Sequence, residues 1–195
     1  MSGDRQRAKE RTRRNLVKAA TALFAKKGID RPSLDEICAE AGVTRGAFYV
    51  HFKDRDELLA AVMDASGTRF LADLFGAAPD DTRALAAEFA RALASGEYPL
   101  TRRGGMRPHQ LLEACARSKE IRRRYVALVE DAIARLAERL RADQGAGRLR
   151  ADLDPSASAT LLLMTAIGAH TLADLEVPLD PGALVAALAG LLAPR

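Results

Sequence analysis

The chain has 195 residues, of which 48% are hydrophobic and 29% charged, and it has no tryptophan. This length supports one large domain or two small ones, and the composition is typical of a globular, largely helical protein without repeats or low-complexity segments. The net charge of +4 is carried entirely by residues 1–57, which contain 13 Lys or Arg and 9 Asp or Glu, whereas residues 58–195 contain 17 of each.

The basic excess is densest in residues 1–27, where nine Lys or Arg accompany only Asp4 and Glu10. Such a run is either a solvated tail or an arm that contacts phosphates, and a groove-reading motif directly after it favours the arm. From about residue 11 to residue 27, apolar residues recur at three- and four-residue spacing, which predicts an amphipathic helix that ends at Gly28.

Two short helices joined by a tight turn follow. Ser33 and Glu36 form a capping-box pattern for the first of them, and Thr44 is suited to cap the second, which we expect to extend to about Phe52. Between them lies Gly42, where we expect two closely approaching backbones to require a small residue. Phe48 and Phe52 share one face and should anchor the second helix in the core. Its opposite face then carries Thr44, Arg45, Ala47, Tyr49 and His51. This pattern predicts a helix-turn-helix that places its second helix in the DNA major groove.

The remainder of the chain also has helical periodicity. A fourth helix should start at Asp54 or Asp56, and a Gly-Pro break at residues 76–79 should separate it from the next. A loop is expected at residues 95–108, and further helices at 81–94, 110–116, 118–143, 155–173 and 181–194. The sequence therefore predicts an all-α fold of about nine helices, with a helix-turn-helix domain with its basic arm at 1–57 and a helical domain at 58–195.

The last two helices stand out because residues 155–173 and 181–194 contain no Asp, Glu, Lys or Arg. Their length raises the possibility of a membrane span, but small polar residues within 155–173 favour burial against protein. We therefore expect a homodimer formed through residues 155–175 and 180–193, and no membrane partner. A two-fold dimer matches a palindromic double-stranded DNA operator.

No pattern indicates catalysis or a cofactor. A nucleophile elbow, a phosphate-binding glycine loop and a carboxylate pair in apolar surroundings are all lacking, so we do not expect an enzyme. Histidines at 51, 109 and 170 form no zinc motif, and Cys38 and Cys115 lack CxxC spacing. These residues predict no metal site, no cofactor and two reduced core thiols. Together with a charged amino terminus that does not resemble an export signal, they indicate a cytoplasmic protein.

The stretch from about Asn15 to Leu59, including LFAKKGID, SLDEICAEAGVTRGAFYVHF and KDRDEL, resembles the tetracycline-repressor (TetR) family of one-component regulators. The resemblance covers less than a third of the chain. It implies contacts with the DNA backbone from Ser33, Tyr49, His51, Lys53 and Arg55. It also implies contacts with base edges or sugars from Thr44, Arg45, Gly46 and Ala47.

Two positions depart from the family pattern, namely Cys38 in place of the usual alanine and Arg55 in place of the usual lysine. Arg45 is the natural candidate for bidentate pairing with guanine, worth about 1–3 kcal/mol of discrimination.

The same resemblance implies a ligand cavity among the helices at about 81–143. Candidate ligand residues, each of which is more simply explained as plain core, are Phe89, Met106, His109, Leu112, Glu113, Cys115, Tyr125 and Met164. His109 and Glu113 are four residues apart and could form a polar anchor or a simple hydrogen-bonded pair.

These observations predict a transcriptional regulator, most simply a repressor released from DNA by an unidentified small-molecule effector. The fourth helix and the break at 76–79 are the expected coupling elements. The alternative is a ligand-independent adaptor or architectural DNA-binding protein that uses the same helix-turn-helix.

Overall fold

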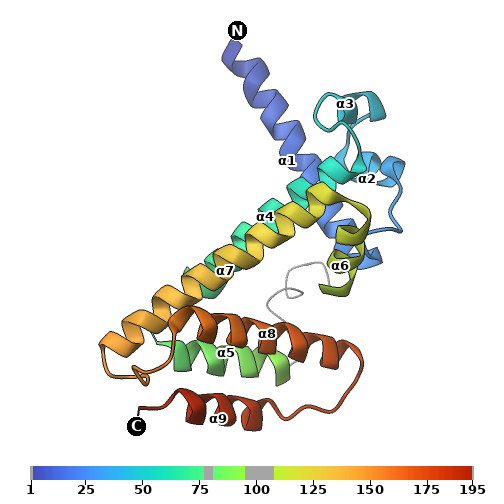
Figure 1. Ribbon diagram of the computed structural model, residues 1–195. Helices are drawn as coiled ribbons and strands as arrows, with labels where there is room; N and C mark the ends of the chain where they lie inside the picture. Colours follow the sequence, from blue (N-terminus) through green and yellow to red (C-terminus); the bar gives the residue numbers. More distant parts are fainter. Residues whose placement is uncertain (1, 77–80, 95–107, 195) are drawn as a thin grey trace. The chain divides into compact units, whose positions relative to one another are not determined.

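The computed structural model describes residues 2–76, 81–94 and 108–194, which form nine helices and no strand (Figure 1). The all-α prediction is therefore confirmed. Contacts divide the chain into two compact units, Met1–Thr68 with Arg103–Tyr125, and Arg69–Arg102 with Val126–Arg195. This division follows contacts rather than function, so the expected functional boundary at residues 57 and 58 stays a prediction.

The first unit contains the amino-terminal helices. These are α1 (Ser2–Lys27), α2 (Leu34–Ala41), α3 (Arg45–Tyr49) and the first part of α4 (Arg55–Gly76). Helix α1 ends before Gly28 as expected, but it begins at Ser2 instead of near residue 11. Its first turn contains Asp4, a carboxylate near the positive helix end, which pairs with Arg7 at 2.9 Å.

One apolar cluster forms the core of this unit. Phe24, Phe48 and Phe52 are among its largest fully buried side chains. Helix α6 (Pro108–Arg117) and the first turns of α7 (Lys119–Gly145) join the same cluster. Their cluster residues lie more than 40 residues after Met63, the last cluster residue of α4. The carboxyl-terminal half of the sequence thus completes the core around the helix-turn-helix.

The two cysteines lie in this cluster as free, buried thiols. Burial raises the pKa of both Cys38 and Cys115, since a thiolate is poorly solvated there. The structure therefore confirms the expectation of buried core thiols.

The second unit is built from α5 (Thr82–Ala94), most of α7, α8 (Pro155–Asp174) and α9 (Pro181–Leu192). Helix α5 packs against both α8 and α9. The core of the unit consists of Leu85, Leu136, Ala137, Leu140, Leu149 and Ala159. Asp154 and Asp180 cap the last two helices, each followed by a proline in the first turn.

A buried carboxylate joins two helices of this unit. Asp143, near the end of α7, is fully buried, accepts a 2.8 Å hydrogen bond from the Thr82 backbone N–H and forms a 2.6 Å ion pair with Arg148. Burial alone would raise the pKa of Asp143, but the bonds from Thr82 and Arg148 outweigh it and leave that pKa lowered. Asp143 thereby satisfies an N–H at the start of α5 that the helix itself cannot pair.

Helix α8 is long and apolar enough, by length and composition, to cross a membrane, with a mean hydropathy of 1.3. Core helices of water-soluble proteins have the same properties. Several of its large apolar side chains are exposed, including Leu161, Met164 and Leu172. Together with Gly168 and Leu175 they follow one side of the helix, so this side lacks a partner within the described chain.

Candidate nucleic-acid interface

The start of α2 is fixed by a reciprocal capping box. The Ser33 hydroxyl accepts a 3.1 Å hydrogen bond from the Glu36 N–H, and the Glu36 carboxylate accepts one of 2.7 Å from the Ser33 N–H. Lys27 also donates to Glu36, at 2.6 Å. The bond from Lys27 and that from Ser33 lower the pKa of Glu36 to about 2. Ser33 itself is exposed, as a residue contacting DNA must be.

The turn between α2 and α3 depends on Gly42 for a different reason than we expected. Gly42 adopts a left-handed conformation with φ 67° and donates to the carbonyl of Ala39, while Val43 donates to that of Cys38. A Cβ added at Gly42 would meet no atom within 4 Å. Glycine is favoured here by its positive φ and not by a close approach of the two backbones.

Helix α3 is the candidate recognition helix. Thr44 caps it by accepting a 3.2 Å hydrogen bond from the Ala47 N–H. The helix ends at Tyr49, sooner than the expected Phe52, and a turn leads on to Phe52. Phe48 and Phe52 are both buried, with ring centroids 5.6 Å apart, so this hydrophobic anchor is confirmed.

The predicted DNA-contacting residues fall into two groups by exposure. Exposed positions are Ser33, Thr44, Arg45, Gly46, Tyr49 and Lys53. Half-buried positions are Ala47, His51 and Arg55. Tyr49 is 54% exposed although it follows the fully buried Phe48, whose ring it contacts edge-on at 5.2 Å. The outward face of α3 is thus available to a partner, while its contacts with DNA stay predictions.

Arg45 is held at the surface by neighbours on both helices. Its Nε lies 3.4 Å from Oδ1 of Asp35 on α2. A side-chain hydrogen bond with Tyr49, followed by the charge of Asp35, raises the pKa of Arg45 further. Nothing in the sequence pattern pointed to Asp35, whose ion pair with Arg45 competes with a base contact.

His51 follows α3 and is half-buried. Its Nδ1 is enclosed without a hydrogen-bond partner in the described chain. Burial lowers the pKa of His51, and the positive charges of Lys9 and Arg13 lower it further. Both effects favour the neutral imidazole over the cation.

Arg55 points back into the protein. Its guanidinium donates to the carbonyls of Ile29 and Pro32 and lies 5.4 Å from the centroid of the Phe24 ring. These bonds hold the loop between α1 and α2 against the start of α4. The contact with the DNA backbone predicted for Arg55 has to compete with this structural role.

The predicted ligand-binding residues do not converge within either unit. Cys115 and Tyr125 pack in the first unit, and Leu112 and Glu113 are exposed on α6. In the second unit, the Phe89 ring meets His170 edge-on at 5.7 Å, whereas Met164 is 64% exposed. Met106 and the side chain of His109 lie outside the described residues.

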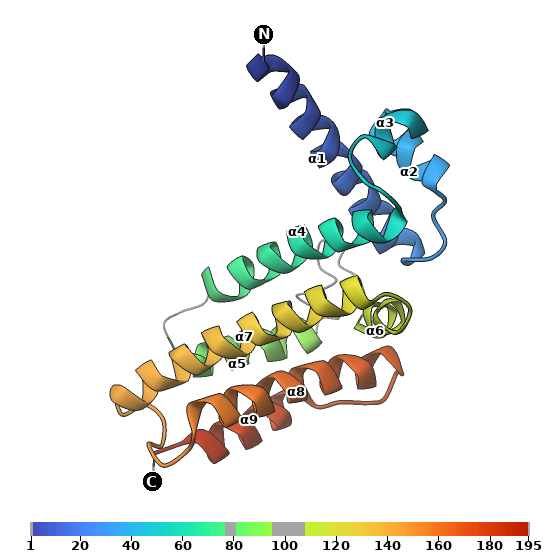
Figure 2. The same ribbon diagram turned by 45° about the horizontal axis from the view of Figure 1, so that its top comes forward.

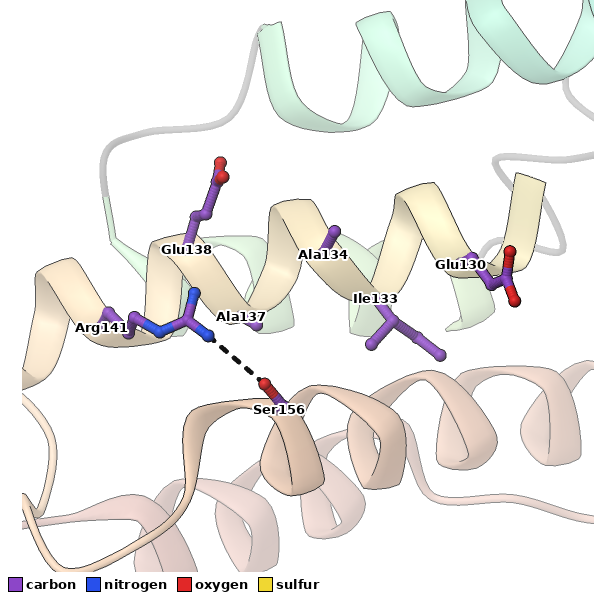
Figure 3. Close-up of a pocket in the computed structure, with 7 residues that line it drawn as sticks. All are labelled: Glu130, Ile133, Ala134, Ala137, Glu138, Arg141 and Ser156. Atoms are coloured by element: carbon purple, nitrogen blue, oxygen red, sulfur yellow. Dashed lines mark hydrogen bonds between the residues drawn. The ribbon is translucent and has the colours of Figure 1, made fainter. Parts of the chain in front are cut away.

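The second unit contains a hollow of about 330 Å³ that none of these candidates lines. It lies between α7 and the first turn of α8, where Arg141 donates a 3.3 Å hydrogen bond to Ser156 (Figure 3). Its other lining residues are Glu130, Ile133, Ala134, Ala137 and Glu138. Most of these are exposed, so the hollow is a surface feature and not an enclosed ligand cavity.

A capped helix, a left-handed glycine turn and a second helix with a buried aromatic anchor and a polar outer face define a helix-turn-helix. Comparison with known proteins agrees. The family model described as "Bacterial regulatory proteins, tetR family" matches residues 16–62, and "Tetracyclin repressor-like, C-terminal domain" matches residues 82–189. The second match alone covers more than half of the chain. The chain therefore belongs to the TetR family of bacterial transcriptional regulators.

Individual relatives show the same relationship. The transcriptional regulator AcrR of Shigella flexneri is 44% identical over 62 residues, 32% of this chain and 28% of that protein. The chain thus matches less than a third of the length of such relatives. SmeT, described as the repressor of the Stenotrophomonas maltophilia multidrug efflux pump SmeDEF, is 30% identical. Its structure covers 87% of this chain and 82% of its own, with a TM-score of 0.60. A complex of SmeT with triclosan aligns with a TM-score of 0.64 at 27% identity, over 91% of this chain and 89% of its own.

Proposed function

We propose that this protein is a repressor that binds a palindromic operator through two copies of its helix-turn-helix and acts in the cytoplasm. The exposed outer face of α3 is the observation that carries this proposal. Thr44, Arg45 and Tyr49 are accessible there while Phe48 holds the helix in the core. A scaffold helix has no need to expose a tyrosine and an arginine side by side, whereas a groove-reading helix does.

Selection of bound duplexes from a random-sequence pool tests the DNA proposal. We expect a two-fold symmetric consensus. The centres of its half-sites should be separated by one helical turn of DNA, which is about 34–36 Å, or by a whole number of turns. Recovery of no consensus, with binding independent of sequence, would favour the architectural alternative.

We further propose that the two copies associate through α8 and α9. The exposed apolar side of α8 supports this, and so does the exposed Leu191 on the charge-free helix α9. Burial of these sides against their counterparts would remove from water the apolar surface that one chain leaves open. Sedimentation should show a dimer at micromolar concentration, and Met164→Lys should shift it toward monomer; a monomeric unaltered chain would contradict this interface.

The effector is proposed to be a small molecule that binds the carboxyl-terminal domain. The match of residues 82–189 to the tetracyclin-repressor-like domain supports this, as does the triclosan complex of SmeT. Such a ligand can release DNA only if it binds the non-DNA conformation more tightly. A panel of apolar compounds that includes triclosan should contain one that both raises the melting temperature and releases the operator. If no compound stabilises the protein, the ligand-independent adaptor is favoured.

A further inference from the structure

Helix α1 begins well before the part of the chain that the family match covers. The match starts at residue 16, whereas the helix starts at Ser2. Residues 2–15, here called the amino-terminal arm, form about 20 Å of additional helix at 1.5 Å per residue. Figures 1 and 2 both show this amino-terminal half of α1 projecting past α2 and α3.

The arm is exposed and strongly basic. It carries six Arg or Lys and only two carboxylates. Both carboxylates are occupied within the arm itself, since Asp4 pairs with Arg7 and Glu10 accepts a 2.9 Å hydrogen bond from Gln6. Most of the positive charge is thus left for an external anion.

The basic side chains lie on two opposite sides of the helix. Arg5, Lys9 and Arg13 recur every four residues and continue the stripe of the buried Leu16 and Ala20 toward the amino terminus. We call these three residues the inner row. The side of the helix turned away from them carries the outer row, Arg7, Arg11 and Arg14, which Lys18 continues beyond the arm.

Contacts place the inner row beside the helix-turn-helix. The Arg13 guanidinium carbon lies 5.0 Å from the centroid of the Phe52 ring. The charges of Lys9 and Arg13 also reach His51, whose pKa is lowered first by burial and then by these two cations. The inner row therefore begins at the carboxyl end of the α3 segment and extends the candidate DNA surface along α1.

We propose that the amino-terminal arm is a second DNA-contacting element, whose inner row binds backbone phosphates flanking the half-site that α3 reads. This inference rests on the proposed function and extends it. We infer that the anion is double-stranded DNA, because the inner row is continuous with the α3 surface. Its positive charge is also opposite to that of the DNA backbone. Long, exposed Arg and Lys side chains suit phosphates, so the arm should lengthen the bound site without adding sequence preference.

A matched pair of double variants of the full-length chain tests this inference. Arg5→Ala/Lys9→Ala removes two charges from the inner row, and Arg11→Ala/Arg14→Ala removes two from the outer row. Alanine preserves the helix in both, and Arg13 is left in place because it packs on Phe52. Affinity for the selected operator is measured by fluorescence anisotropy over a salt series, on one duplex with long flanks and one trimmed to its half-sites.

Log affinity falls as log salt rises, and on the flanked duplex the inner-row variant should make this negative slope shallower. The expected change is about 1.8 per bound subunit, or about 0.9 for each lost phosphate contact. On the trimmed duplex this difference should disappear. The outer-row variant should change the slope by less than half as much on either duplex.

Equal slopes for the two variants on the flanked duplex would overturn the inference, because the arm would then act only through its net charge. An inner-row variant identical to the unaltered chain would also overturn it. Failure of the unaltered chain to bind any selected duplex is distinct from both, since it would refute the proposed function itself. Circular dichroism of each variant establishes that the helical content is unchanged.

Discussion

At the scale of single residues, neighbouring side chains already position Arg45 on the face of α3 in the absence of DNA. Arg45 lies between Asp35 and Tyr49, which restricts the positions its guanidinium adopts. The pair with Asp35 is largely exposed, with side chains 57% and 69% accessible, so it contributes little to stability and a stronger partner can displace it. A guanine edge that offers two acceptors is such a partner.

Replacement of Arg45 should therefore change specificity more than general affinity. We expect Arg45→Ala to lose about 1–3 kcal/mol of discrimination at one base pair of each half-site. Tyr49→Phe should instead weaken binding to all sequences, because its hydroxyl is suited to a phosphate oxygen. Competition binding with a set of single-base operator variants distinguishes the two effects. Uniform loss of affinity from Arg45→Ala across the whole set would argue against a base contact.

At the scale of secondary-structure elements, the loop between α1 and α2 is held from two sides. Arg55, the first residue of α4, donates to two loop carbonyls, and Arg117, the last residue of α6, pairs with Asp30 at 2.7 Å. The Arg117 pair is exposed, with about half of each side chain accessible, so it contributes little to stability. The Arg55 bonds matter more because they satisfy carbonyls of the buried residues Ile29 and Pro32.

Arg55→Ala should accordingly destabilise the protein. We expect a loss of about 1.5–3 kcal/mol in the free energy of unfolding, since two carbonyls lose a charged donor. Lys53→Ala is the control, because it removes the same charge from a side chain that is 86% exposed and should stay within about 0.5 kcal/mol. Urea denaturation measures both. If the two variants unfold alike, Arg55 has no structural role of the kind described, and its predicted phosphate contact becomes the better explanation.

At the scale of the whole molecule, acid should destabilise the fold in two steps. Burial lowers the pKa of His51 and His170 below the usual 6.5. Hydrogen bonds from Lys27 to Glu36, and from Arg123 and Arg124 to Glu120, lower the pKa of each of these carboxyls from 4.5 to about 2. In both cases the unfolded chain binds more protons than the folded one, so stability falls as the pH falls.

The first loss should begin as the pH drops through about 6.5, and the second should run from about 4.5 to 2. Melting temperatures across this range measure it. His51→Gln/His170→Gln should flatten the first step and keep the second. A double variant that keeps the full decline between pH 6.5 and 5 would show that these two histidines do not cause it.

Features that depend on neighbouring residues could be predicted from the sequence. The Ser33–Glu36 capping box, the Thr44 cap and the anchor formed by Phe48 and Phe52 all follow from spacings of three or four residues, and the structure confirms each one. The family resemblance rested on the same short stretch. Local hydrogen bonds and side-chain periodicity carry enough information there to define where both helices begin and which face the second of them exposes.

Only the tertiary structure revealed the contacts between distant parts of the chain. Spacing gave no sign that Arg55 turns inward to Ile29 and Pro32, or that α6 completes the amino-terminal core. The contact between Arg13 and the Phe52 ring shows that the inner row lies along the helix-turn-helix, and the sequence spacing did not indicate this contact. Each of these contacts joins residues that are far apart in sequence, so periodicity within one helix shows which side is apolar but not what that side meets.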